Sequence, residues 1–496
     1  MSSNSASAKI LQDARAEFET RCVVALITGS EASTATLGQM ERSIFRRVLH
    51  LGLRLLQLFI ATRVEAEAHG EHRCTDGCVL PYHSQQPANY FSVFGKVTFR
   101  RAYFYRAGQS CCPLDAALSL PARCYSDFLM ELAGLLAVDG VFDKALEMLS
   151  KFLGLALPKL ALETWVREES ALVTAFYDQK AIFPASREGR ILVVQADGKG
   201  VPLVRSDKVK APARRGKGHQ KTRKKEAMAT AVYTIEPYLR TPPSVVEALF
   251  PTETEAARTL PARPSPCHKQ VFATLNGKTW ALERLQERVR QREGRHIRAR
   301  VALTDGARAL QQRMREKFPA FRLVLDIMHV LEYLWKAGTA LYGETDPQRG
   351  VWVKAQLLEI LSSRTDQVIR HLENKAGTLR KTSQACKGLQ QVANYFQRNR
   401  EYMDYATYLR QGWPIGTGVI EGVCRHVVKD RMELSGMRWT VAGADALLAL
   451  RAVNENGDWD EFHTFRRAHC HEQIYGAPSP ETTWIDQAQY LDIKGF

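Results

Sequence analysis

The chain has 496 residues, of which 45% are hydrophobic and 25% charged, and these values exclude wholesale disorder, collagen-like repeats and a disulfide-stapled mini-protein. At roughly 100 to 200 residues per domain, the length predicts about three domains. Lys and Arg outnumber Asp and Glu by 69 to 53, and the formal net charge of +16 indicates a polyanionic partner such as nucleic acid or an anionic membrane surface.

The membrane is the weaker of these two partners. No window holds the roughly 18 to 20 uninterrupted apolar residues that a spanning helix requires, and the best candidate, residues 49–62, is broken by His50, Arg54 and Gln57. The first residues lack the charged start and apolar middle of a secretory signal. Ten cysteines scattered along a chain of this size are not typical of a disulfide framework. We therefore expect a cytosolic protein with reduced thiols.

The first two regions differ in pattern. Residues 1–70 carry helical periodicity and predict a helical arm or dimerisation segment. Residues 71–125 predict a small cysteine-containing module, in which the alternating stretch Val93 to Tyr105 forms a β-hairpin pivoting at Gly95. Two thiols before this hairpin and two after it resemble a zinc-ribbon layout, with Cys74, Cys78, Cys111 and Cys112 as the candidate ligands. Adjacent Cys111 and Cys112 do not chelate easily as a pair, so ordinary thiols are the alternative.

Residues 126–187 predict helices, two of which are joined by a short turn around Gly154 and Pro158. This pattern fits a helix-turn-helix whose second helix, around Lys159 to Arg167, enters the major groove of DNA. An ordinary helical hairpin fits the same pattern. The net positive charge favours DNA docking.

The rest of the chain predicts an α/β fold. Over residues 188–330 the order is three strands, helix, strand, helix, strand, which is typical of a ribonuclease-H-like domain with a mixed sheet flanked by helices. Residues 331–410 predict a long all-helical insertion, and residues 411–476 return to the same domain. Residues 477–496 form a polar tail.

Three acidic residues occupy the ends of predicted elements. Asp197 closes the first strand, Asp305 closes the fourth, and Glu421 lies in the first turn of the helix that follows GWPIGTG, with Thr417 as its N-cap. Magnesium prefers oxygen ligands, and two divalent cations suit phosphodiester cleavage, so the three carboxylates predict a shared metal site. The alternative is that each is an unrelated capping or turn residue.

Four ordered motifs carry a family resemblance: VVQADGKGVP, VALTDGARAL, LVLDIMHVLEYLW and GWPIGTGVIEGVCRHVVKDRMELSGMRW. They resemble the DDE transposases of bacterial insertion sequences, most closely the ISKra type, in a wider group shared with Mutator-like and hAT elements. The resemblance implies a magnesium- or manganese-dependent enzyme, with two ions per site, that cleaves transposon end repeats and transfers the 3′ hydroxyl strand to target DNA. It also implies a bacterial, nucleoid-associated protein that assembles as a homodimer or larger oligomer.

The resemblance assigns roles residue by residue. Asp197, Asp305 and Glu421 match the catalytic, metal-binding triad, and Asp326 and His329 match an accessory Asp-x-x-His signature. Asp326 competes with Asp305 for the second triad position because it also ends a predicted strand. We place Asp305 in the triad, since the fourth strand is expected beside the first. His329 is either functional or a satisfied core histidine.

Basic and aromatic residues near these acids predict DNA contacts. A basic run leaves the first catalytic strand, and Lys or Arg residues fill ten of its 21 positions from Arg205 to Lys225. The predicted contacts are Arg205, Lys208, Lys210, Arg214, Arg215, Lys217, Lys221, Arg223, Lys224, Lys225, Arg425 and Lys429. Trp413 either stacks on an unpaired base or supports the turn before Glu421.

The sequence leaves three functions open. A DNA transposase fits all the motifs. A structure-specific nuclease of the same fold would cut without joining strands, and a non-catalytic DNA-binding protein derived from a transposase would bind without cutting.

Overall fold

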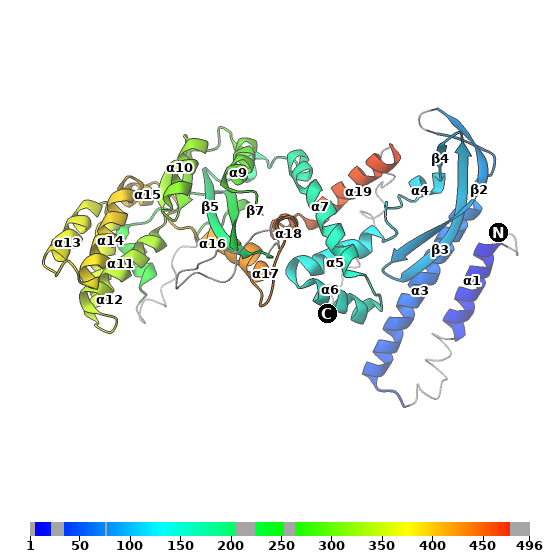
Figure 1. Cartoon of the computed structure of the whole chain (residues 1–496), viewed down its shortest axis with the longest axis horizontal. Coiled ribbons are helices and arrows are strands. Elements are labelled where there is room, and N and C mark those ends of the chain that lie inside the picture. Colours follow the sequence, from blue (N-terminus) through cyan, green and yellow to red (C-terminus); the bar gives the residue numbers. More distant parts are fainter. Residues whose placement is uncertain (1–4, 21–33, 75–76, 205–223, 252–262, 477–496) are drawn as a thin grey trace, which may run out of the picture. The chain divides into compact units, whose positions relative to one another are not determined.

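The computed structural model describes residues 5–20, 34–74, 77–204, 224–251 and 263–476 (Figure 1). The chain divides into two compact units, one formed by Met1–Phe176 with Asp458–Phe496 and the other by Tyr177–Gly457. Among the described residues, no helix is long and apolar enough to cross a membrane.

The first unit opens with two helices, α1 (Ala6–Glu17) and α3 (Leu37–Glu65). Thr36 and Gln39 form a reciprocal capping box that starts α3. Much of the apolar face of α3 is solvent-exposed, including Phe45 at 48% and Val48 at 57% of the accessible area.

A four-stranded antiparallel sheet follows, in the order β1 (Glu71–Arg73), β2 (Val79–Ser92), β3 (Gly95–Arg106) and β4 (Gln109–Cys111). The predicted hairpin was therefore too short: its first strand begins at Val79, and the turn lies at residues 93–94, before Gly95. The turn residue Phe94 packs on α3, where a Cβ on Gly52 would lie 2.6 Å from its ring. Close packing explains this glycine within a helix.

The helices α4 (Pro113–Ala117), α5 (Asp127–Asp139), α6 (Phe142–Leu153), α7 (Lys159–Gln179) and α19 (Trp459–Tyr475) complete the first unit. Gly154 ends α6 in the left-handed conformation. On α7, Leu162, Trp165 and Val166 are buried, so one side of the helix expected to enter DNA belongs to the core of the unit. Lys159, at the start of the helix, and Arg167 are exposed.

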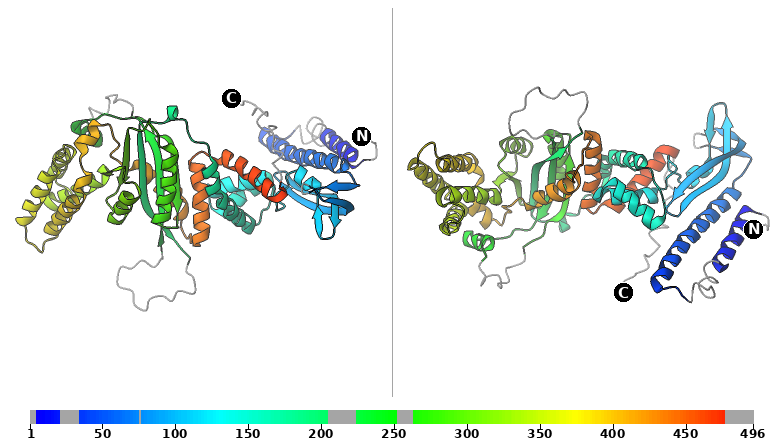
Figure 2. Two further views of the ribbon diagram at one scale, coloured as in Figure 1. Left: turned by 90° about the horizontal axis from the view of Figure 1, so that it is seen from above. Right: turned by 60° about the horizontal axis from the view of Figure 1, so that its bottom comes forward.

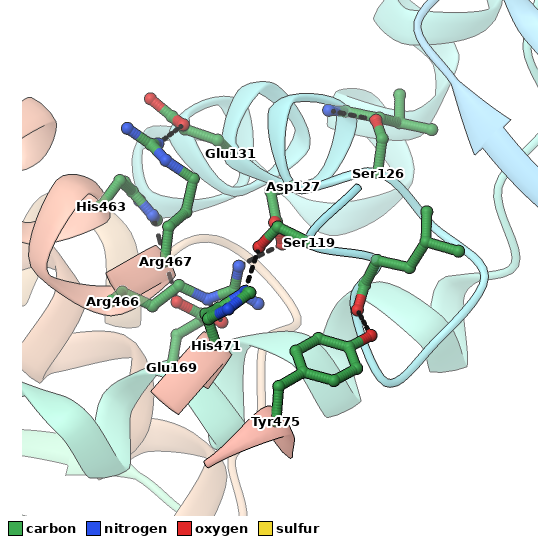
Figure 3. A network of polar contacts seen from close by, with 12 residues as sticks. Ser119, Ser126, Asp127, Glu131, Glu169, His463, Arg466, Arg467, His471 and Tyr475 are labelled. Atoms are coloured by element: carbon green, nitrogen blue, oxygen red, sulfur yellow. Dashed lines mark hydrogen bonds and ion pairs between the residues drawn. The ribbon is translucent and has the colours of Figure 1, made fainter. Parts of the chain in front are cut away.

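A buried polar network joins α19 to α5 and α7 (Figure 3). Arg466 donates to Asp127 and to Glu169, the latter over 2.7 Å from Nε to Oε1. Arg467 donates to Glu131 over 3.2 Å, and His463 stacks on Trp165. The network ties the end of the described chain to helices that precede it by about 300 residues in sequence.

Glu169 makes this network pH-sensitive. Burial raises the pKa of Glu169 from 4.5 to about 7, although the Arg466 guanidinium opposes the shift. The folded state therefore binds the proton of Glu169 more tightly than the unfolded state does. The unfolding free energy that this proton contributes is lost as pH rises from about 4.5 through 7. We expect Glu169→Gln to gain stability over the wild type with rising pH, by up to about 3 kcal/mol above pH 7. Urea unfolding at pH 5 and pH 8 measures this, and an equal difference at both values would contradict it.

The second unit contains a five-stranded mixed sheet in the order β7-β6-β5-β8-β9. The strands are β5 (Ile191–Pro202), β6 (Lys224–Ile235), β7 (Cys267–Thr274), β8 (Ala299–Thr304) and β9 (Arg322–Leu325). β5 pairs antiparallel with β6 and parallel with β8. Residues 191–196 of β5 are all buried, because helices cover both faces of the sheet; α9 (Lys278–Arg292) runs along the strands in Figure 2.

Two predicted boundaries were wrong. Asp197 does not close its strand, because β5 continues to Pro202 and Gly198 pairs with Met228 of β6. A Cβ on Gly198 would lie 2.3 Å from the Glu226 side chain, so the glycine serves close strand packing, not a turn. The fifth strand ends at Leu325, and Asp326 is the N-cap of the next helix.

A group of helices lies to one side of the sheet, over the residues where a helical insertion was expected (Figure 1). It comprises α11 (Ile327–Tyr342), α12 (Gln348–Leu361), α13 (Thr365–Gly377), α14 (Gln384–Asn399) and α15 (Tyr405–Arg410). The sheet and the insertion share one apolar core. The segments that follow the insertion are α16 (Gly418–Val423), a π-helical segment (Cys424–Lys429), α17 (Asp430–Met432) and α18 (Val441–Glu455). The unit also contains α8 (Pro242–Leu249) and α10 (Arg308–Lys317), which precede the insertion.

Candidate active site

Asp197, on the central strand β5, lies near Asp305, which directly follows the neighbouring strand β8. β5 and β8 are parallel neighbours with Gln195 opposite Leu303, so Asp197 and Asp305 each lie two residues further along in the same register. Adjacent strands are about 4.8 Å apart, which places the two residues side by side. Burial raises the pKa of Asp197, and the nearby Asp305 charge raises it further. Such repulsion favours binding of a cation between the two carboxylates.

Glu421 is held against β5 by a buried glutamine. Gln195 accepts a hydrogen bond from the backbone N–H of Ile420 over 2.8 Å and donates to the Tyr233 hydroxyl over 2.9 Å. Gln195 and Asp197 lie on the same face of the strand because side chains alternate. This contact therefore brings the start of α16 to the face of β5 that carries Asp197.

A second contact joins the same two elements. The Cys424 thiol donates to Asp197 Oδ2 with a sulfur–oxygen distance of 3.4 Å. Cys424 follows Glu421 by three residues, a spacing that places two helical side chains on one face. Burial and the Asp197 charge raise the pKa of this thiol, so it stays protonated and acts as a donor. Cys424 is thus close to Asp197 and near enough to Glu421 to be affected by its charge.

Asp326 and His329 lie close to Glu421. Asp326 is fully buried, and its Oδ1 accepts from the Thr417 N–H over 2.8 Å, while its Oδ2 accepts from His329 N over 3.0 Å and His329 Nδ1 over 2.7 Å. Asp326, His329 and Glu421 each offer a ligand atom within 4.8 Å of the others. This group differs from the predicted triad, which joined Glu421 to Asp197 and Asp305.

His329 is the positive charge among these acids. Its hydrogen bond to Asp326 raises the pKa of His329 to about 9, burial opposes this, and the charges of Asp326 and Asp305 add to the rise. The imidazole is therefore protonated at neutral pH and donates to Asp326. A protonated histidine carries no lone pair for a metal, but it attracts an anionic group such as a phosphate.

The side chains of Asp305 and Asp326 differ in their hydrogen bonds and in their exposure to solvent. Both oxygens of Asp326 already accept from protein donors, and the side chain has no exposed surface. Asp305 is only half-buried, and among the described residues its one side-chain hydrogen bond is from Ala307 N to Oδ1, over 2.9 Å. The carboxylates of Asp197, Asp305 and Glu421 are hard oxygen donors and fit magnesium or manganese.

The insertion fixes the loop that carries Asp305. Tyr395 of α14 donates its hydroxyl to the Asp305 carbonyl over 3.0 Å, and its ring stacks on Tyr333 of α11 at 3.7 Å. Tyr405 donates to the Leu325 carbonyl over 2.8 Å, at the end of the neighbouring strand. The insertion therefore holds the ends of β8 and β9.

Replacement of Gly306 tests whether Tyr395 supports the loop that carries Asp305. Gly306 has a positive φ of 89°, and a Cβ there would lie 2.5 Å from the Tyr395 hydroxyl. We expect Gly306→Ala to cost about 3 kcal/mol, from left-handed strain plus displacement of Tyr395. Gly436→Ala is the matched control, because Gly436 has a φ of 79° and open space around it, so only about 1 kcal/mol is expected. Thermal unfolding of both variants compares them, and equal losses would contradict the contact.

The predicted DNA contacts fall into two groups. Arg205, Lys208, Lys210, Arg214, Arg215, Lys217, Lys221 and Arg223 lie outside the described residues. Lys224 and Lys225 are exposed at the start of β6, where Lys224 pairs with Glu433, and Arg425 and Lys429 are exposed on the π-helical segment. The four described residues are accessible to a polyanion.

Trp413 and Thr417, two residues that precede Glu421, both contact other side chains. Trp413 is half-buried and stacks on Tyr408 at 5.5 Å, as the supporting role predicted. Thr417 precedes α16 but does not cap it with its side chain; its hydroxyl instead donates to Glu421 Oε1 over 2.7 Å. That bond orients the carboxylate.

Sequence reasoning missed Gln195, Cys424 and Tyr395. Gln195 stands two residues before Asp197 in an otherwise apolar strand, and that position was the only local signal. Cys424 and Tyr395 carry no such signal, because their partners are more than 85 residues away in sequence.

The chain is similar to one family model and to solved structures. Residues 37–227, less than half of the chain, match an uncharacterised protein family, UPF0236. No curated protein matches the chain. Among solved structures, a chain of the Drosophila P element transposase strand transfer complex is 9% identical, with 72% of this chain and 83% of that chain covered and a TM-score of 0.25.

Proposed function

We propose that the protein is a DNA transposase that binds transposon ends, cleaves DNA and joins the 3′ hydroxyl strand to target DNA. One observation carries the proposal: Asp197 lies on β5, Asp305 directly follows the parallel neighbour β8, and the Cys424 thiol, three residues after Glu421, contacts Asp197. More than 100 residues separate each of the three acids from the next in sequence. The strand order β7-β6-β5-β8-β9 supports a ribonuclease-H-like domain. The transposase-like motifs and the net charge of +16 support a DNA substrate.

The three carboxylates have the catalytic role in this proposal. Asp197, Asp305 and Glu421 would hold two magnesium or manganese ions, which supply an activated attacking oxygen and stabilise the leaving oxygen. The Thr417 hydroxyl orients Glu421, and the Cys424 thiol orients Asp197. His329, which is protonated at neutral pH, would face a phosphate of the bound strand.

Asp326 acts as a positioning residue. It connects the end of β9 to Thr417 and to His329, and so sets the distance between α11 and the helix that carries Glu421. It contacts no substrate in this proposal.

DNA binding draws on the basic residues around the site. Lys225, Arg425 and Lys429 are exposed, and several phosphate contacts would make the affinity fall steeply with salt. Joining two transposon ends requires two active sites, so we propose a homodimer or larger assembly.

An end-joining assay tests the proposal. Labelled duplexes taken from the DNA that flanks the gene are incubated with the full-length protein, target plasmid and magnesium. We expect cleaved ends and a joined product, and neither with EDTA. Cleavage without joining would instead identify a nuclease of the same fold, and salt-dependent binding without cleavage a non-catalytic DNA-binding protein.

A further inference from the structure

The small sheet of the first unit carries a second cluster of metal-ligand side chains. His72, Cys74 and Cys111 each offer a ligand atom within 4.8 Å of the other two. His72 and Cys74 are two residues apart at the end of β1 and therefore project to the same side. Cys111 ends β4, at the other edge of the same sheet.

The strand register explains how distant residues meet. His72 is paired with Leu80, and Cys111 is paired with Phe104. Directly opposed residues share a face of the sheet. Leu80 and Phe104 are buried together with Ala102, and Cys74, Cys78 and Cys111 pack against this small apolar cluster. His72, Cys74 and Cys111 therefore bring their ligand atoms together, and Cys78 packs against the same apolar cluster.

The sulfur geometry separates metal binding from a disulfide. The Cys74 and Cys111 sulfurs are 3.9 Å apart. Two thiolates bound to one tetrahedral zinc at about 2.3 Å lie about 3.8 Å apart, whereas a disulfide requires about 2.05 Å. Cys74 N donates to the Cys78 carbonyl over 2.8 Å, and Gly77 N donates to the Cys74 carbonyl over 3.0 Å. These hydrogen bonds hold Cys78 beside Cys74.

Cys112 does not belong to this cluster. It is the N-cap residue of α4, and the charges that act on its thiol are those of Arg101, Asp115 and Glu67. The cluster therefore differs from the sequence-based set of four cysteines, because it contains His72 and does not contain Cys112.

We propose that His72, Cys74, Cys78 and Cys111 bind one structural zinc ion in a tetrahedral Cys3His site. Binding releases the protons of the three thiols, because the thiolates are the ligands. The ion would fasten β1 and β4, the two edge strands, around a core that contains only three buried apolar side chains among the described residues. So small a core gains much of its stability from such a crosslink.

Metal analysis of the untagged full-length protein tests this site. We expect about one zinc per chain by mass spectrometry for the wild type and for Cys112→Ser, the matched control, and a loss of at least about 80% for Cys74→Ser, Cys111→Ser and His72→Ala. Equal loss in Cys112→Ser and Cys111→Ser, or no zinc in wild type from zinc-supplemented cells, would overturn the proposal.

Cobalt substitution keeps the test independent of variant folding. Wild-type protein reconstituted with Co²⁺ is expected to show thiolate-to-cobalt charge transfer and the intense visible bands of tetrahedral cobalt, with three thiols protected from alkylation. Weak octahedral bands or unprotected thiols would contradict the Cys3His assignment. Neither measurement depends on DNA cleavage, so failure here leaves the proposed function standing.

Discussion

Glu421→Gln is expected to lower magnesium-dependent DNA cleavage on the order of 1,000-fold while leaving DNA affinity within about twofold of the wild type. Glutamine keeps the size of the side chain and an oxygen that can accept from Thr417, but it removes the negative charge that a divalent ion requires. Metal-ion stabilisation of the reaction is worth several kcal/mol, which corresponds to a rate change of this size. Single-turnover cleavage and a binding titration on the same DNA measure the two quantities.

Glu332→Gln is the matched control for this variant. Glu332 is exposed on α11 one turn from His329, close enough to act on its charge, yet it takes part in none of the hydrogen bonds described for the site. Its replacement should change cleavage by less than about threefold. Undiminished cleavage in Glu421→Gln, or equal losses in both variants, would exclude Glu421 as a metal ligand.

The second large effect is expected for Asp326→Ala, at about 4 kcal/mol of unfolding free energy. The substitution removes the N-cap of α11 and leaves the Thr417 N–H and the charged His329 without their shared buried partner. Ser383→Ala is the control, because Ser383 caps α14 through a single hydrogen bond, to Cys386 N, and its loss should cost about 1 kcal/mol. Urea unfolding compares the two, and equal costs would contradict the bridging role of Asp326.

Asp326→Asn isolates the charge of the same residue. The pKa of His329 is about 9 in the folded protein against an ordinary 6.5, so the stability that its proton contributes is present below pH 6.5 and is lost as pH rises through 9. We expect this loss between pH 6.5 and 9 in the wild type and a much flatter profile in Asp326→Asn. Parallel profiles would show that Asp326 does not raise the pKa of His329.

The sequence was most informative about the order of the elements in the second unit. Residues 191–194 form a continuous apolar run, and the later strands alternate with amphipathic helices, so the order of strands and helices follows from pattern alone. The predicted end of the first strand was wrong because Gly198 was interpreted as a turn residue. Gly198 is a strand residue that lets Glu226 approach, and this reason is visible only once β6 is placed beside β5.

The sequence singles out three acids as candidates but does not show the contacts around them. Asp197, Asp305 and Glu421 stand out because each adjoins glycine near the end of an element. The role of Asp326 depends on Thr417, 91 residues away, and no local pattern encodes such a contact. In the first unit, His72 was missed for the same reason, since its neighbours Cys74 and Cys111 are brought to it by strand register.

Anomalous scattering from manganese-soaked crystals of the protein with DNA ends tests the shared metal site most directly. The account predicts manganese bound by oxygens of Asp197 and Asp305, with Glu421 completing the site, at about 2.0 to 2.4 Å from each ligand atom. Manganese absent from these carboxylates at saturating concentration, or bound only by Asp326 and His329, would contradict it.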